Sequence, residues 1–146
     1  MSKISRDILK GWDVLVVDDE IDSQEVAKRL LKHYGAIVST ADNGKEALDV
    51  LQTATPVFIL SDISMPELDG WGLVYELQQD RSTAEIPIFA LTAHAMHGDR
   101  ERAMAVGFYN YLTKPLTPAT FIDDLLKILQ AVPQLQEKLA PSLQEK

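Results

Sequence analysis

The chain has 146 residues, 46% of them apolar, and a net charge of −8, which suits one folded domain and argues against a disordered chain. It contains no cysteine, so disulfides, thiolate metal sites and cysteine nucleophiles are excluded. The negative charge argues against direct binding to nucleic acid, because phosphate contacts need a basic face. No apolar run approaches the ~20 residues that cross a bilayer, and residues 1–10 have no apolar signal core, so we expect a cytoplasmic protein without membrane insertion.

Short apolar runs alternate with helical patterns along the chain. The runs predict five strands, at residues 13–17, 36–40, 57–62, 86–91 and 108–112. The first predicted helix is capped by Asp22 or Ser23 and ends at Gly35. The helical patterns predict four more helices, at 45–52, at 71–79, from about 97 to 106, and from about 118 to 132.

This alternation predicts an α/β fold. Apolar strands separated by amphipathic helices indicate a doubly wound parallel sheet with helices on both faces. The flavodoxin-like (βα)5 arrangement, with strand order 2-1-3-4-5, fits five such units, although the sequence alone does not separate it from other orders.

The expected domain is 13–132, preceded by a lead-in at 1–12 and followed by a C-terminal tail at 133–146. Pro141 should interrupt any long helix in the tail, which we therefore expect to be a helix extension that frays. A partner-binding segment is the alternative for this tail.

Polar side chains follow four of the predicted strands. Asp18 and Asp19 follow the first, Asp62 ends the third, Thr92 follows the fourth, and Lys114 follows the fifth. The carboxyl ends of parallel strands meet at one edge of the sheet, where ligands bind. We therefore expect three carboxylates, one hydroxyl and one ammonium in a single pocket.

Three carboxylates in one pocket repel one another, and a pair at ~4 Å costs roughly 4 kcal/mol at an effective dielectric constant near 20. One lysine offsets only part of this repulsion. A divalent cation would offset more, and Mg²⁺ typically takes one or two carboxylates and shares itself with a phosphate. The set is therefore suited to phosphoryl chemistry, in which an aspartate attacks phosphorus.

Four separated motifs resemble the receiver domain of two-component response regulators, the CheY-like superfamily. They are Val-Asp-Asp-Glu at 17–20, Ser-Asp-Ile-Ser-Met-Pro-Glu-Leu-Asp-Gly at 61–70, Leu-Thr-Ala at 91–93 and Tyr-Leu-Thr-Lys-Pro at 111–115. Each motif alone is a weak signal, but all four occur in order and each lies at a strand end. The resemblance covers residues 13 to about 131.

The resemblance implies a phosphoacceptor and a metal site. Asp62 would accept the phosphoryl group. Asp19 and Asp62 would bind Mg²⁺ directly, together with the backbone carbonyl of Ser64, and Asp18 would act through bound water. Mn²⁺ is an alternative metal at the same site.

The resemblance also implies a switch. Lys114 would pair with the phosphoryl group, and its bond to Pro115 would be cis. Thr92 would move toward a phosphoryl oxygen, Tyr111 would swing inward, and the face made by the fourth helix, fifth strand and fifth helix would change. Strand alternation puts Tyr109 on the same side as Tyr111, so we expect Tyr109 to enlarge this output surface.

Under this resemblance the chain is a signalling switch rather than a metabolic enzyme. It would take a phosphoryl group from a histidine kinase or a histidine phosphotransfer protein, catalyse that step itself, lose the group by hydrolysis, and act on a downstream protein that the sequence does not identify. It is similar to stand-alone regulators and to receivers cut from hybrid kinases.

Two other functions are alternatives to the signalling switch. A Mg²⁺-dependent small-molecule phosphatase needs an Asp-x-Asp pair, and here Ser64 and Glu20 stand two residues after Asp62 and Asp18. A phosphorylation-independent interaction domain is the other alternative, and it predicts no Mg²⁺-dependent change at Asp62.

Overall fold

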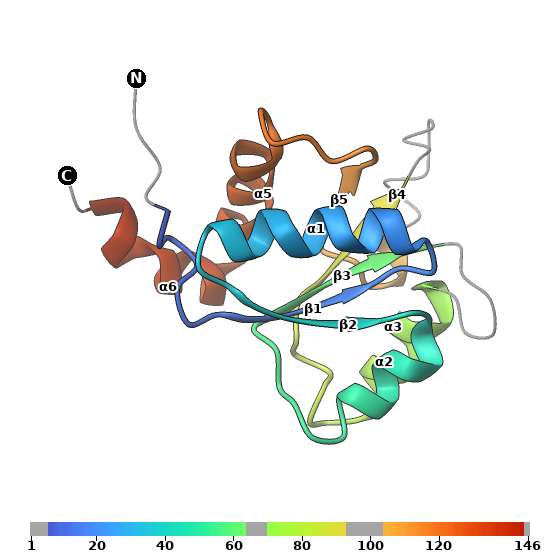
Figure 1. Ribbon diagram of the computed structural model, residues 1–146. Helices are drawn as coiled ribbons and strands as arrows, with labels where there is room; N and C mark the ends of the chain where they lie inside the picture. Colours follow the sequence, from blue (N-terminus) through green and yellow to red (C-terminus); the bar gives the residue numbers. More distant parts are fainter. Residues whose placement is uncertain (1–5, 64–69, 93–103, 145–146) are drawn as a thin grey trace.

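The computed structural model describes residues 6–63, 70–92 and 104–144, and it contains one parallel five-stranded sheet (Figure 1). The strand order is β2-β1-β3-β4-β5, which confirms the predicted topology. The strands are β1 (Asp13–Val17), β2 (Ile37–Ala41), β3 (Phe58–Asp62), β4 (Ile88–Thr92) and β5 (Asn110–Thr113).

Helices cover both faces of this sheet. They are α1 (Ile21–His33), α2 (Gly44–Val50), α3 (Gly70–Gln79), α5 (Phe121–Gln130) and α6 (Pro133–Gln144). α1 and α5 pack on one face, and α2 and α3 pack on the other (Figure 1). The helix expected at about 97–106 lies mostly outside the described residues, although 104–106 are helical. None of the helices in the described part of the chain is both long and apolar enough to span a bilayer.

The central strands are buried on both faces, which explains their continuous apolar sequence. In β1, Val14 and Val16 belong to the core under α1 and α5, whereas Leu15 and Val17 belong to the core over α2 and α3. A slip of one residue would exchange these two sets, so the register of the sheet is firmly specified.

The register aligns the carboxyl ends of the strands. Val17 pairs with Ser61 and Asp62 pairs with Leu91, so β1, β3 and β4 end together. Thr92 in turn pairs with Thr113 at the end of β5. The residues that follow these strands therefore meet at one edge of the sheet, as the sequence predicts.

The core extends into both terminal segments. Leu9 and Trp12, before β1, are buried together with Leu135 and Leu139 of α6. Lys138 Nζ lies 5.8 Å from the Trp12 ring centroid, and the Leu9 N–H donates to the Tyr34 carbonyl over 2.9 Å. These segments close the end of the sheet that lies opposite the carboxyl ends of the strands.

The expectation that Pro141 would interrupt a long helix is wrong, because α6 continues to Gln144. Pro141 lies in the last turn of α6, where a missing N–H removes only one hydrogen bond from the helix. Leu135 and Leu139 hold the preceding turns against the core.

Leu139→Ala should lower the free energy of unfolding by about 2–5 kcal/mol, because it leaves a cavity among fully buried side chains. Urea denaturation followed by circular dichroism measures this loss. Gln136→Ala, on the exposed side of the same helix, should change stability by about 0.5 kcal/mol or less. Equal effects of the two substitutions would show that α6 does not belong to the cooperative core.

Candidate functional site

Four of the sequence-predicted residues meet at the carboxyl edge of the sheet. Asp18 follows β1 and is fully buried, and its N–H donates to the Ala41 carbonyl at the end of β2 over 3.0 Å. Asp62 is the last residue of β3 and is also buried. Thr92, half-buried, ends β4, and its carbonyl accepts a 2.8 Å hydrogen bond from the N–H of Lys114. The backbone alone therefore fixes the relative positions of these residues.

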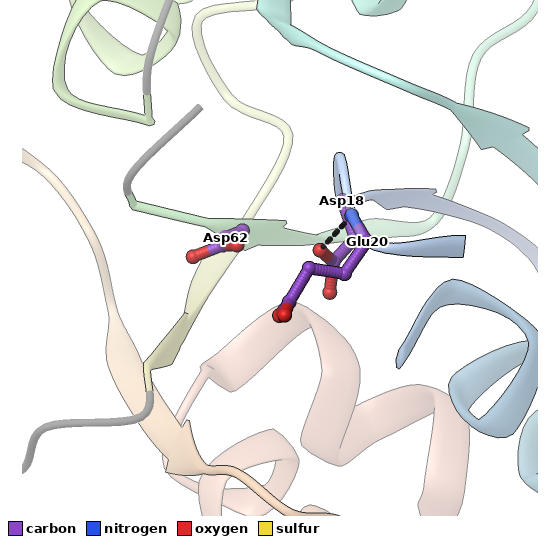
Figure 2. Close-up of side chains that lie close together, drawn as sticks. All are labelled: Asp18, Glu20 and Asp62. Atoms are coloured by element: carbon purple, nitrogen blue, oxygen red, sulfur yellow. Dashed lines mark hydrogen bonds between the residues drawn. The ribbon is translucent and has the colours of Figure 1, made fainter. Parts of the chain in front are cut away.

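The Lys114 ammonium lies at the centre of the site and contacts three carboxylates. Its Nζ is 2.9 Å from Asp18 Oδ2, 3.0 Å from Glu20 Oε1 and 3.1 Å from Asp62 Oδ2. Figure 2 shows the three acidic side chains around the ends of β1 and β3. Three carboxylates against one ammonium leave two negative charges uncompensated when every group is ionised.

Burial and neighbouring charges shift the pKa values of these groups in different directions. Burial raises the pKa of Asp18, and this effect outweighs the opposing influence of Lys114. Burial lowers the pKa of Lys114, but its contacts with Asp18 and Glu20 outweigh burial and raise the pKa overall. The hydrogen bond from Lys114 lowers the pKa of Glu20. Lys114 therefore stays protonated, and Asp18 holds the most costly charge of the site.

Asp18 has one oxygen that lacks a well-directed donor. Its Oδ1 accepts a 2.9 Å hydrogen bond from the Glu20 N–H, drawn as the dashed line in Figure 2. Its Oδ2 is buried and, among the described residues, meets the Lys114 ammonium at ion-pair distance without hydrogen-bond geometry. A buried carboxylate oxygen that has an ion pair but no directed donor favours a further cation or a cation-bound water nearby.

Glu20 is a member of the site that the sequence reasoning missed. It is the N-cap residue of α1, with an extended backbone (φ −92°, ψ 114°), and its side chain makes no capping hydrogen bond. The expectation that Asp22 or Ser23 caps α1 is therefore wrong, because the helix begins earlier, at Ile21. A glutamate at a position that favours short polar side chains was the available signal.

The metal ligands implied by the resemblance are only partly brought together. Among the described residues, carboxylate oxygens within 4.8 Å of one another come from Asp18, Glu20 and Asp62. Asp19 is exposed and does not belong to this group. Ser64 lies outside the described residues. An all-oxygen donor set with excess negative charge fits a hard divalent cation such as Mg²⁺.

A buried amide ties the ends of β1 and β2 together. Gln24 Nε2, on α1, lies 3.0 Å from the Asp18 carbonyl, 3.1 Å from the Ala41 carbonyl and 3.0 Å from Asp42 Oδ1, and its two N–H groups serve these three acceptors, with one N–H shared. The sequence reasoning did not identify Gln24, because its polar side chain gives no signal of which backbone groups it reaches. It holds the loop from which Asp18 and Glu20 project.

The residues expected to form a switch surround β5. Tyr111 is half-buried and packs against the core over α2 and α3. Tyr109 precedes the first residue of β5, is 40% exposed, and packs edge to face on Phe89 with ring centroids 6.3 Å apart. It therefore lies at the end of β5 opposite Lys114. The bond between Lys114 and Pro115 is cis, which confirms that expectation.

Residues 14–126 match the family described as "Response regulator receiver domain". The chain belongs to this family. It is thus a receiver domain of the two-component response regulator type, and its strand order agrees with that assignment.

Similar proteins cover most of the receiver domain. This chain is 42% identical over 114 residues to the "Uncharacterized 14.6 kDa protein in sodA1 3'region" of Leptolyngbya boryana. The match covers 78% of this chain and 87% of that protein. The chain spans only 40–51% of the length of six further curated relatives.

Two solved structures are similar across the whole fold. The chemotaxis response regulator CheY4 of Vibrio cholerae has a TM-score of 0.74 and 30% identity, over 87% of this chain and 100% of that chain. The receiver domain of sensor histidine kinase PA1611 of Pseudomonas aeruginosa has a TM-score of 0.71 and 33% identity, over 83% and 96% of the two chains. The latter is described with a magnesium ion coordinated in its active site cleft.

Lys114→Met should lower the free energy of unfolding in EDTA by about 3 kcal/mol, because it leaves buried carboxylates without their counter-ion. Saturating Mg²⁺ should restore more stability to this variant than it adds to the wild type, because a cation then replaces the lost ammonium. Urea denaturation with and without Mg²⁺ measures both effects.

Lys45→Met is the control for this experiment, since Lys45 is exposed on α2. It should leave both stability and the Mg²⁺ increment near the wild-type values. Equal Mg²⁺ increments in all three proteins would contradict the assigned role of Lys114 as the counter-ion of the acidic site.

Proposed function

We propose that this receiver domain is a phosphorylation-activated switch that accepts a phosphoryl group on Asp62. One observation carries the proposal: the Asp62 carboxylate is buried at the end of a central strand and lies 3.1 Å from an ammonium that also contacts Asp18 and Glu20. A buried acid beside a fixed cation suits a nucleophile for phosphorus. The donor would be the phosphohistidine of a histidine kinase or of a histidine phosphotransfer protein.

The transfer involves one bond made and one broken. A carboxylate oxygen of Asp62 attacks phosphorus, the new P–O bond forms, and the P–N bond to the donor histidine breaks with the electron pair staying on nitrogen. Lys114 pairs with one phosphoryl oxygen, and the Thr92 hydroxyl donates to another. Water later attacks phosphorus, which releases inorganic phosphate and regenerates the Asp62 carboxylate. The domain thus promotes its own modification and is a signalling component rather than a metabolic enzyme.

The acidic cluster and the receiver family support Mg²⁺ as the cofactor, with Mn²⁺ as the alternative. Asp19, Asp62 and the Ser64 backbone carbonyl would hold the ion directly, and Asp18 would hold it through water. When bound, the ion supplies positive charge that screens the transferring phosphoryl oxygens.

The output of the switch is proposed for the face around β5 and α5, together with the helix expected before β5. Thr92 would move toward the phosphoryl group, and Tyr111 would follow inward. The exposure of Tyr109 supports a contribution to this surface, where a downstream protein would bind. A cytoplasmic location, where histidine kinases deliver phosphoryl groups, belongs to the same proposal.

Incubation with acetyl phosphate and Mg²⁺ should add one phosphoryl mass to the wild type in intact-mass spectrometry. Asp62→Asn should show no adduct, and EDTA should abolish the adduct of the wild type. Asp49→Asn, an exposed acid on α2, is the control and should be modified like the wild type.

An adduct in Asp62→Asn equal to that of the wild type would place the modification elsewhere. No adduct in the wild type, together with no response of tryptophan fluorescence to beryllofluoride and Mg²⁺, would favour a phosphorylation-independent interaction domain.

A further inference from the structure

Among the described residues, the Lys114 ammonium donates hydrogen bonds to Glu20 Oε1 and Asp62 Oδ2, and its third carboxylate contact, with Asp18 Oδ2, is an ion pair. An ammonium group carries three N–H donors, and three carboxylates lie within 3.1 Å of Lys114 Nζ. A phosphoryl oxygen arriving on Asp62 would be a fourth anionic oxygen at this one ammonium, so we expect it to replace one of the three present contacts. Which contact yields decides how the site changes from its resting to its phosphorylated form.

The burial of the three carboxylates differs sharply. The Asp18 side chain is 0% exposed, that of Asp62 is 11% exposed, and that of Glu20 is 65% exposed. Releasing Asp18 would leave a buried carboxylate uncompensated, which is costly. Asp62 is the acceptor and stays beside its own phosphoryl group. Glu20 alone can leave Lys114 and regain full hydration, because an exposed ion pair contributes little net stability.

The local conformation of Glu20 also points to a specific role. The first position of a helix is usually taken by Ser, Thr, Asp or Asn, whose side chains cap free N–H groups, but here it is taken by Glu20, whose side chain makes no such bond. It extends to Lys114, 94 residues away in sequence, and its Oε1 lies 3.4 Å from the Ser23 hydroxyl. A local rule is broken here in favour of a contact within the site, as is common at functional positions.

We propose that Glu20 is a positioning residue whose carboxylate holds the place on Lys114 that a phosphoryl oxygen takes when Asp62 is modified. In the resting protein Glu20 keeps Lys114 in position over Asp62. On phosphorylation Glu20 withdraws into water, and its negative charge no longer faces the phosphoryl oxygens. The inference rests on the proposed function, because the displaced contact matters only if Asp62 acquires a phosphoryl group.

This role predicts competition at one ammonium. Removing the Glu20 contact should make a phosphoryl mimic bind more tightly, because the mimic no longer displaces a bound carboxylate. An exposed ion pair corresponds to about a two- to fivefold change in an equilibrium constant. A metal ligand would behave in the opposite way, since its loss weakens the binding of Mg²⁺ and of the mimic together.

The experiment measures the affinity of beryllofluoride at saturating Mg²⁺, and the affinity of Mg²⁺ alone, by tryptophan fluorescence or calorimetry. Glu20→Gln removes the charge and keeps the length of the side chain. Glu20→Asp keeps the charge but loses one methylene of reach, and the shorter side chain is suited to cap α1 instead. Asp22→Asn makes the same charge change as Glu20→Gln, two residues away and in the first turn of α1.

Glu20→Gln and Glu20→Asp should both bind beryllofluoride about two- to fivefold more tightly than the wild type. Asp22→Asn should resemble the wild type, and Mg²⁺ affinity in Glu20→Gln should match that in Asp22→Asn. Tighter binding in Glu20→Asp separates the lost contact from a general effect of charge. Thermal unfolding of each variant checks that the fold is intact.

Two outcomes would overturn the inference alone while the wild type still binds beryllofluoride and accepts a phosphoryl group. One is that the Glu20 variants do not differ from Asp22→Asn. The other is a fall in Mg²⁺ affinity of about tenfold or more in Glu20→Gln, which would make Glu20 a metal ligand. A wild type that neither binds beryllofluoride nor is modified by acetyl phosphate would refute the proposed function. The proposed role of Glu20 would then fail as well.

Discussion

The site depends on one ammonium that lies among three carboxylates. Asp18, Asp62 and Lys114 project from the ends of three strands that the sheet register holds level. Two of the carboxylates are buried, so water cannot screen them, and Lys114 is the cation that makes their proximity tolerable. Because a single ammonium cannot neutralise three acids, the geometry leaves charge for a divalent cation to balance.

The surrounding structure holds this negatively charged edge of the sheet in place. β1 and β3 are buried on both faces, and the alternation of their side chains between two cores prevents a shift in register. Gln24 then joins the Asp18 carbonyl to the end of β2 through a buried amide. The Asp18 backbone is therefore held by Gln24 and Ala41, and its carboxylate contacts the Glu20 N–H and the Lys114 ammonium.

The fold and the placing of Asp18, Asp62 and Lys114 at one edge could be predicted from the sequence, because strand and helix patterns are local and parallel strands end at one edge. The contact of the Glu20 side chain with Lys114 could not be predicted, because the two residues are distant in sequence. The preference for short polar residues at helix starts also pointed to Asp22 or Ser23 as the cap. The reach of Gln24 and the burial of Leu9 and Leu139 were missed for the same reason. Each depends on tertiary contacts that leave no periodic signal.

Electrostatic interactions dominate at one end of the sheet, and apolar packing dominates at the other. At the carboxyl end, three acids share one ammonium, so their charge balance would change when a cation or phosphoryl group arrives. At the opposite end, Trp12, Leu135 and Leu139 seal the core with apolar contacts that no such ligand alters. Stability concentrated away from the site lets the acidic edge keep an excess of negative charge, and such an edge would suit the proposed phosphorylation switch.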